Sequence, residues 1–314
     1  MVLYEISPVY FLELKVDALR ASANKPNEKT IIDATVVPTP STMAVVLVNR
    51  SPAMIRETPS DKINANNYDC RQDNSYFIPS KRSSYLFNSS ISGIDESDLC
   101  VIIGSDIRKE APIIGARIRK RVSENENNFP ILRIGHKYDL TLDVKEIGES
   151  YSSLTNLRSK NLNSIFNKSK KPLFLIGQGP LCSPDAENIF HFVLNLHNEI
   201  VKDKSWNGFN ILQTYSGRVG ALDLEFYNKN NVKKNHINEI YKGKYELLIL
   251  FGADEIDFDK IPKNTYIVYI GHHGDKAVSR ADLIIPTPCF TEKEGIYVNI
   301  EGRAQVSRQI KLPI

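Results

Sequence analysis

The stretch VYIGHHGDKAVSRADLIIPTPCFTEKEGIYVNIEGR, residues 268–303, decides the fold of this chain. Its first residues, Val268–Ile270, form a short β-branched and aromatic run, and a glycine-bracketed turn with two histidines follows. Residues 281–285 form a second apolar run, which ends at two prolines because proline cannot donate a hydrogen bond to a central ladder. The stretch predicts a strand, a turn, a buried strand and a charged exit loop.

Four further apolar segments upstream predict strands, and two of them are followed by a predicted helix. Apolar runs of strand length occur at residues 99–103, 131–134, 173–176 and 247–251. Apolar residues at helical spacing follow the first and third runs, at 112–122 and 185–200. Strands that alternate with helices favour parallel pairing with right-handed crossovers. The sequence therefore predicts an α/β fold of open, mostly parallel sheets flanked by helices.

Changes in composition and in hydrophobic periodicity along the chain predict its domain boundaries. Residues 1–60 mix short apolar runs with prolines and lack a sustained period, so we expect an atypical, loosely ordered segment there, with Val45–Val48 as a candidate strand. Residues 61–314 are expected to form one α/β domain. Within it we expect two lobes, at about 61–140 and 171–310, and a Ser/Asn-rich connecting segment at 141–170.

Composition excludes several classes of protein. A net charge of +3 on 314 residues does not predict nucleic-acid or membrane-surface binding. Apolar runs stay well short of the ~20 residues that a membrane-spanning helix needs. The four cysteines lie far apart without a CxxC pair, so they favour a reducing compartment and give no framework for a metal or an iron–sulfur cluster.

Four segments carry a resemblance to a known family: SISGIDESDLCVIIGSDIRKEAPIIGARIRK (90–120), LIGQGPL (175–181), WNGFNILQTYSGRVGALDLEF (206–226) and GHHGDKAVSRADLIIPTPCFTEKEGIYVNIEGRAQ (271–305). In this order they resemble the G subunit of bacterial NADH–quinone oxidoreductase, the counterpart of the largest peripheral-arm subunit of mitochondrial complex I. The resemblance runs from about residue 61 to residue 309. It concerns the C-terminal part of that family, which is similar to the molybdopterin oxidoreductases and implies two interleaved lobes.

The resemblance implies a structural role in the peripheral arm, without a redox centre in this chain. The family's iron–sulfur clusters belong to a cysteine-rich N-terminal part, so we expect no cofactor here and clusters elsewhere in the complex. The implied partners are other peripheral-arm subunits, on the cytoplasmic face of a bacterial inner membrane or on the matrix face, with membrane contact only through the complex. The alternatives are a molybdopterin-dependent oxidoreductase fragment and a truncated, non-functional gene product.

The glycine turns at strand ends are the candidate sites for a cofactor. Gly177 and Gly179 lie between a predicted strand and a helix, where backbone amides can bind phosphate. Gly104 and Gly252 follow two other strands, and ligands of open α/β sheets bind at the carboxyl ends of strands. Against this reading, no complete GxGxxG motif is present, and an acid follows both Gly104 and Gly252 closely.

The candidate metal ligands are few. His272 and His273 precede Asp275, and imidazole with carboxylate suits zinc or iron, although neighbouring side chains in a turn generally diverge. Cys70 lies near the place where molybdenum enzymes put their protein ligand, and Arg71 beside it is a candidate for lowering the pKa of the thiol. A structural role is the competing interpretation for all three ligands.

Three carboxylates in the exit loop, Glu292, Glu294 and Glu301, are spaced in a way compatible with acid–base chemistry. The simpler interpretation pairs them with Lys293 and Arg303 on an exposed loop. We therefore predict no catalytic residue in this chain.

Overall fold

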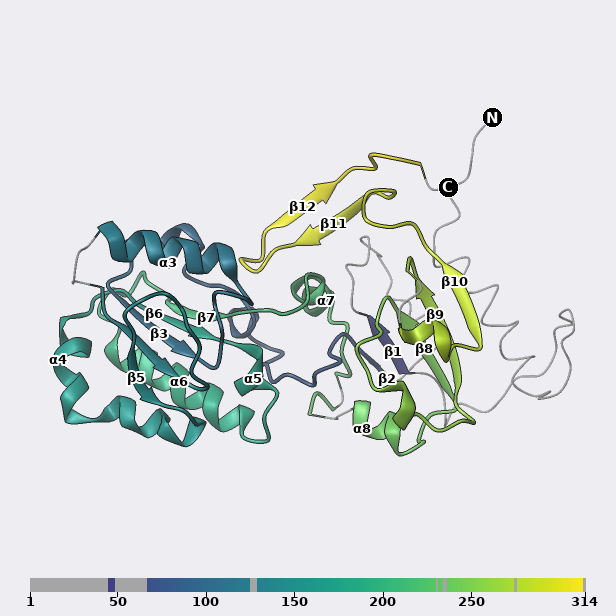
Figure 1. Ribbon diagram of the computed structural model, residues 1–314, viewed down its shortest axis with the longest axis horizontal. Helices are drawn as coiled ribbons and strands as arrows, with labels where there is room; N and C mark the ends of the chain where they lie inside the picture. The colour runs from purple at the N-terminus through teal and green to yellow at the C-terminus, as the bar shows by residue number, and fades with distance from the viewer. Residues whose placement is uncertain are drawn as a thin grey trace, which may run out of the picture. The chain divides into compact units, whose positions relative to one another are not determined.

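A computed structural model gives the fold and describes residues 45–48, 67–124, 129–229, 231–233, 236–273 and 276–312. The chain divides into two compact units (Figure 1). Unit 1 consists of residues 1–72, 221–296 and 306–314, and unit 2 of residues 73–220 and 297–305. Most of the expected segment 1–60 lies outside the described residues.

Unit 2 is built on a five-stranded parallel sheet of order β5-β4-β3-β6-β7. Its strands are β3 (Leu99–Ile103), β4 (Ile131–Ile134), β5 (Lys145–Gly148), β6 (Pro172–Ile176) and β7 (Phe209–Ile211). All residues of β3, β4, β6 and β7 are buried, whereas β5 is partly exposed at one edge. Nearly continuous apolar runs are what a sheet covered on both faces requires.

Two apolar clusters cover the two faces of this sheet. Alternate residues of β3, such as Val101, pack with apolar residues of α6 (Ala186–Ile200), α4 (Lys160–Lys168) and the 3-10 helix η3 (Tyr151–Arg158). The intervening residues, such as Ile102, pack with α3 (Pro112–Glu124). The period of two along each strand therefore gives a helix–sheet–helix sandwich, which Figure 1 shows around β3 and β6.

Unit 1 contains a second five-stranded parallel sheet, of order β10-β9-β8-β1-β2. The strands are β1 (Val45–Val48), β2 (Asn67–Asp69), β8 (Leu247–Phe251), β9 (Tyr266–Gly271) and β10 (Leu283–Pro286). The expected strand at Val45–Val48 is confirmed, and it pairs with both β2 and β8 inside the sheet. Residues from the start of the chain are thus integrated into the fold of unit 1.

The remaining elements are short. They are α5 (Gln178–Leu181), α7 (Arg218–Asp223), α8 (His236–Tyr241), a two-stranded ribbon of β11 (Gly295–Val298) and β12 (Ala304–Ser307), and the 3-10 helices η1 (Arg82–Ser84), η2 (Ser92–Glu96), η4 (Phe258–Lys260) and η5 (Lys276–Ser279). Among the described residues, no helix has both the length and the apolar composition needed to cross a bilayer.

The α/β fold with parallel sheets and flanking helices is confirmed. Two segments differ from the expectation. Residues 141–170, expected as a connection between lobes, supply β5, η3 and α4 to unit 2. The expected exit loop forms the β11–β12 ribbon, because its alternating residues in Gly295–Val298 find a partner strand a few residues later.

Candidate functional site

Three glycine turns meet at the carboxyl edge of the unit 2 sheet. Gly104, Gly135 and Gly177 directly follow β3, β4 and β6, and parallel strands bring these turns to one edge. A Cβ atom on Gly177 would lie 2.3 Å from the carbonyl oxygen of Gly104, and one on Gly135 would lie 3.1 Å from the Cα of Gly104. Gly179 lies close by, with the same carbonyl oxygen 3.7 Å from its Cβ position. The structure therefore brings Gly104, Gly177 and Gly179 together.

The amides of these turns continue the ladder of the sheet. The Gly104 N–H donates to the Ile134 carbonyl at 2.8 Å, and the Gly177 N–H donates to the Ile103 carbonyl at 2.9 Å. Gly135 donates in the same way to the last residue of β5, at 3.0 Å. A phosphate-binding turn needs amides that point at the ligand. These three amides are already used within the sheet.

Side chains fill the space beside Gly104. A Cβ atom on this residue would lie 2.5 Å from Pro180 Cγ and 2.9 Å from the Tyr151 hydroxyl oxygen. Burial raises the pKa of Tyr151 above its usual range, so its hydroxyl keeps its proton at neutral pH. Since Gly104 has a φ of +60°, the close packing and the left-handed backbone both require glycine here.

A carboxylate of the chain occupies the turn after Gly104. Glu110 accepts the Ser105 hydroxyl through Oε2 at 2.8 Å and the Asp106 N–H through Oε1 at 3.1 Å. These are the kinds of donor that an anionic ligand would use at a strand end. A phosphate placed here would have to displace Glu110 and would be repelled by it.

Gly252 lies in unit 1, at the carboxyl end of β8. As at Gly104, the glycine amide donates within the sheet and a carboxylate lies nearby. The Gly252 N–H donates to the Ile270 carbonyl at 2.7 Å. Beside it the Gln72 side chain and Glu255 form a closed pair. The Gln72 Nε2 donates to the Glu255 carboxylate at 2.6 Å, and the Glu255 N–H donates to the Gln72 Oε1 at 3.1 Å. This strand end also presents a carboxylate with its hydrogen bonds in place.

The strand-end glycine amides are therefore not available to the pyrophosphate of a pterin–guanine dinucleotide. In each unit the strand-end glycine amide donates to a neighbouring strand, and an internal carboxylate accepts a hydrogen bond from a donor close to the turn. A dianionic pyrophosphate needs unused donors or cations at such an edge.

Cys70 lies in unit 1 and is 2% exposed, with its N–H donating to the Phe226 carbonyl at 3.0 Å. The residues on either side of it form a buried ion pair, in which Arg71 Nη2 lies 2.7 Å from Asp69 Oδ2. The same nitrogen donates to the Val232 carbonyl at 2.8 Å. The guanidinium that we considered as an activator of the thiol is bound to Asp69, because a buried cation requires a paired charge.

His272 and His273 follow β9 on the surface of unit 1, with their Nδ1 atoms 2.9 Å apart. Asp275 lies outside the described residues. The described part of the chain contains no group of three or more His, Cys, Asp or Glu side chains placed to bind a metal ion. Structural and catalytic zinc sites use three or four protein ligands, so this pair by itself does not constitute such a site.

Two of the exit-loop carboxylates, Glu301 and Glu292, accept hydrogen bonds within the loop or from a neighbouring segment. Glu301 accepts the Ile91 N–H through Oε1 at 2.6 Å and the Asn299 side-chain amide through Oε2 at 3.0 Å. Glu292 accepts the Cys289 N–H at 3.0 Å. Glu301 therefore fixes the turn of the ribbon to unit 2.

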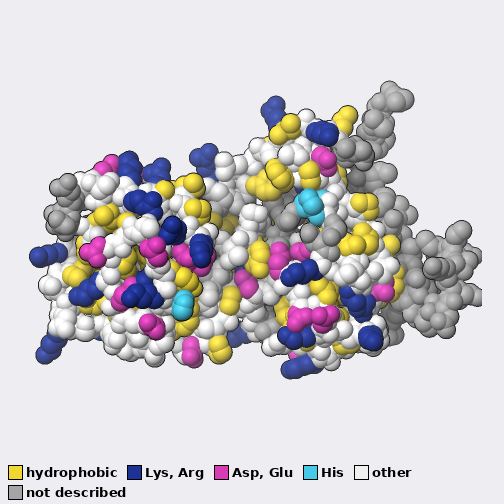
Figure 2. All heavy atoms as spheres, viewed as in Figure 1, with side chains coloured by type: hydrophobic (Ala, Val, Ile, Leu, Met, Phe, Trp, Pro, Cys, Tyr) yellow, Lys and Arg dark blue, Asp and Glu magenta, His cyan; other side chains and the backbone are white. Residues whose placement is uncertain are grey.

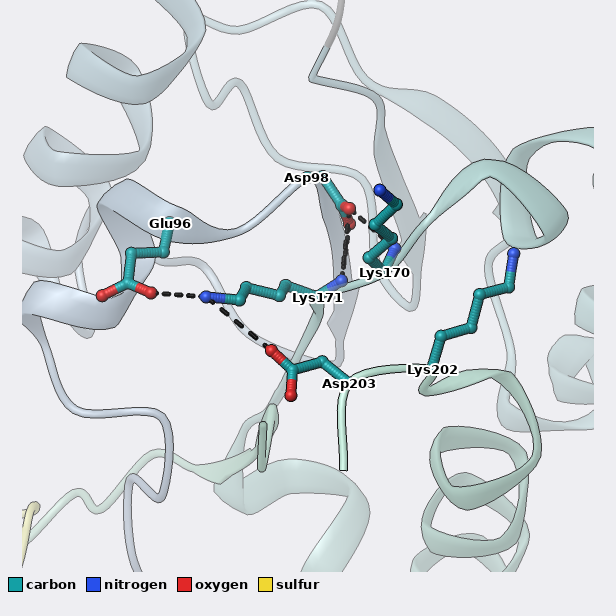
Figure 3. A pocket seen from close by; sticks show the side chains of 6 residues that line it. All are labelled: Glu96, Asp98, Lys170, Lys171, Lys202 and Asp203. Atoms are coloured by element: carbon teal, nitrogen blue, oxygen red, sulfur yellow. Dashed lines mark hydrogen bonds and ion pairs between the residues drawn. The ribbon is translucent and has the colours of Figure 1, made fainter. Parts of the chain in front are cut away.

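The opposite, amino edge of the unit 2 sheet carries a charged hollow of about 430 Å³ (Figure 3). Acids and lysines in equal number line it: Glu96, Asp98, Asp203, Lys170, Lys171 and Lys202. As Figure 3 shows, the Lys171 ammonium lies between Glu96, at 2.6 Å, and Asp203, at 3.9 Å. Because the charges balance and the edge is the one away from the strand ends that bind ligands, we assign this hollow a structural role.

Asp98 organises this edge. Its carboxylate accepts the Ser169 hydroxyl at 2.5 Å, the Lys170 N–H at 2.7 Å and the Lys171 N–H at 3.2 Å. These bonds hold the start of β6 beside the start of β3. Sequence reasoning missed both Asp98 and Glu110, although an acid directly before a buried strand and one close before a helix are visible signals.

Comparisons with known proteins agree with the resemblance. The chain is 32% identical over 293 residues to the G subunit of the NADH-quinone oxidoreductase of Rickettsia felis, covering 91% of this chain and 42% of the relative. It is 37% identical over 234 residues to the mitochondrial NADH-ubiquinone oxidoreductase 78 kDa subunit of Candida albicans, covering 74% and 31%. It is 39% identical over 229 residues to the 75 kDa subunit of Reclinomonas americana, covering 71% and 32%. The chain thus spans less than half the length of these relatives.

A solved structure shares the fold. It is the formyltransferase/hydrolase complex FhcABCD from Methylorubrum extorquens with methylofuran, at a TM-score of 0.57 and 12% identity, covering 85% of this chain and 86% of that chain. At that identity the likeness concerns the fold alone. The profile of the molybdopterin oxidoreductases matches residues 40–313, which include β1 and both sheets. This chain therefore belongs to the molybdopterin oxidoreductase family.

Proposed function

We propose that this chain is a structural part of the peripheral arm of a respiratory NADH–quinone oxidoreductase. In this role it carries no redox centre, and it binds neighbouring subunits that hold the iron–sulfur clusters. The observation that carries the proposal is the identity of 32–39% to subunits of this enzyme, spread over 71–91% of the chain. The complex would transfer electrons from NADH to quinone and couple this transfer to proton translocation. This chain would lie on the cytoplasmic face of a bacterial inner membrane or on the matrix face.

The strand-end turns support a structural role over catalysis. Catalysis by a molybdopterin enzyme requires bound pterin, and the turns at Gly104, Gly177 and Gly252 use their amides within the sheets. Glu110 and Glu255 place carboxylates beside two of these turns. A lobe with this chemistry is suited to pack against protein, since the glycine amides at these strand ends are already paired within the sheets.

The test is native-gel migration of the endogenous protein from gently solubilised membranes, with a parallel stain for NADH oxidation. We expect the chain to migrate with the active band of high mass. Migration of all the protein as a small, inactive species would overturn the proposal and favour a non-functional product.

Metal analysis of the purified chain tests the enzymatic alternative. We expect molybdenum far below one atom per chain. A stoichiometric amount of molybdenum, retained through gel filtration, would show that the chain is a molybdopterin-dependent oxidoreductase and would overturn the structural assignment.

A further inference from the structure

The turn of the β11–β12 ribbon, residues 299–302, binds the segment 82–91 of unit 2. We call this turn the ribbon tip. Three consecutive tip residues each accept one hydrogen bond from the segment: the Ile300 carbonyl from the Phe87 N–H at 2.7 Å, the Glu301 carboxylate from the Ile91 N–H at 2.6 Å, and the Gly302 carbonyl from Arg82 Nη2 at 2.8 Å. The tip and these donors belong to the same compact unit. The tip is therefore held by a matched set of acceptors and donors.

Hydrogen bonds inside the ribbon tip keep its acceptors in one arrangement. Asn299 Oδ1 accepts the N–H groups of Glu301 and Arg303, at 3.1 and 2.9 Å, and the Asn299 carbonyl accepts the Gly302 N–H at 2.9 Å. The second carboxylate oxygen of Glu301 accepts the Asn299 side-chain amide at 3.0 Å. Gly302 has a φ of +79°, which glycine adopts without strain. Because these bonds are internal to the turn, the tip moves as one body.

The ribbon tip has little apolar anchoring. Ile300 is partly buried and packs against the apolar cluster that contains Phe87. Residues 299–302 are all half-buried, and residues 304–306 of β12 are exposed. Figure 2 shows hydrophobic side chains mixed with charged ones of both signs over the ribbon. A two-stranded ribbon is marginally stable by itself, and segments with few buried apolar contacts open at a lower free energy than core strands do.

The segment beneath the ribbon tip extends one edge of the unit 2 sheet. Phe87 forms an antiparallel bridge with Asn210 of β7, and the Ile211 N–H donates to the Leu86 carbonyl at 3.0 Å. The Phe87 N–H donates to Ile300 of the tip. An uncovered sheet edge presents N–H groups that pair with other chains, and proteins cover such edges with loops or charged residues. The tip covers the edge at this position.

We propose that the ribbon tip is a latch, closed by Glu301, which covers this edge and opens as one body while the sheet of unit 2 stays folded. Glu301 provides the strongest contact, because an ionised acceptor binds an N–H about twice as strongly as a neutral one does. In the open state the N–H groups of Phe87 and Ile91 contact water. The latch is a property of the chain alone, so its test is independent of the proposed function.

Native-state hydrogen exchange of the purified full chain tests the latch. In the wild type we expect the amides of Phe87 and Ile91 to exchange at least about 100-fold faster than the buried Cys100 amide of β3. We also expect the exchange of the first two amides to depend weakly on urea, since a local opening exposes little surface. The same strong urea dependence at all three amides would mean that the tip leaves only on global unfolding, and would overturn the proposal.

Two substitutions loosen the latch by different means. Glu301→Ala removes the carboxylate, whereas Gly302→Ala strains the tip backbone at its φ of +79°. We expect each variant to raise the exchange rates of Phe87 and Ile91 together, by about tenfold, with their weak urea dependence retained. Glu301→Gln keeps an acceptor oxygen, so we expect a rise of about threefold or less.

The matched control is Glu294→Ala, which removes an exposed acid outside the tip and changes neither rate. A rise at Ile91 alone in Glu301→Ala would show that the contacts open independently. No rise at either amide would show that Glu301 does not close the tip. Each of these two results overturns the latch. Circular dichroism verifies the folding of the variants, and the urea dependence of the wild type decides the question even where a variant does not fold.

Discussion

The two edges of the unit 2 sheet differ in how they are stabilised. The carboxyl edge consists of glycine turns whose backbones touch, with Gly177 packed against the Gly104 carbonyl. The amino edge is an open hollow held by Asp98 and by ion pairs around Lys171. In open α/β sheets the carboxyl edge is the usual place for a ligand. Here the glycine turns at that edge pack closely against one another and against Pro180 and Tyr151.

Gly104→Ala gives the largest expected effect, on the carboxyl edge. The new methyl would meet Pro180 at 2.5 Å on a backbone with a φ of +60°, so overpacking and backbone strain add. We expect a loss of about 3 kcal/mol in the free energy of unfolding, measured with urea. The control is Gly179→Ala, whose methyl has its nearest neighbour at 3.3 Å. Equal losses for both would show that this edge is not tightly packed.

Asp98→Ala tests the amino edge. The substitution removes the acceptor for the Ser169 hydroxyl and for two backbone N–H groups at the start of β6. We expect a loss of about 2 kcal/mol, because donors that are left unpaired cost more than an ordinary hydrogen bond contributes. Urea unfolding beside the wild type measures it. An unchanged urea midpoint would mean that the hydrogen bonds of Asp98 at the start of β6 do not contribute to stability.

We expect His197 to make the amino edge sensitive to acid. Burial lowers the pKa of His197, whose Nε2 accepts the Gly208 N–H at 3.0 Å just before β7. A depressed folded-state pKa means that stability is full above the unfolded-state value, about 6.5, and falls as the pH drops through it. We expect the melting midpoint to decline below about pH 6.5, and His197→Gln to flatten this decline. The same decline in both proteins would assign it to other groups.

Glu96→Gln gives the smallest expected effect. The substitution breaks the ion pair between Glu96 and Lys171, and the Glu96 side chain is 63% exposed. Exposed pairs contribute little, so we expect a change below about 0.5 kcal/mol that shrinks further in high salt. A change as large as that of Asp98→Ala would make the ion pairs, and not the Asp98 hydrogen bonds, the main support of this edge.

The sequence by itself determined the class of fold and most of its interior. The apolar runs at residues 99–103, 131–134 and 247–251 became β3, β4 and β8 with the expected bounds, and the helical period at 185–200 became α6. A strand that is buried on both faces has a continuous apolar run, and an amphipathic helix has apolar residues at helical spacing. Both patterns are visible in the local sequence. The resemblance carried by four segments also identified the relatives correctly.

Only the tertiary structure decided how the candidate residues are used. Nothing local shows that the Gly104 amide donates to β4, that Glu110 fills the turn after β3, or that Arg71 is bound to Asp69. The edge strand β5, with its sequence Lys-Glu-Ile-Gly, also has too little apolar pattern to be predicted. The physical reason is that a turn that binds phosphate and a turn that closes a sheet share the same glycines. They differ in the acceptor of the glycine N–H group, which is either a ligand or a carbonyl distant in the sequence. The tertiary fold determines which acceptor lies within hydrogen-bond distance.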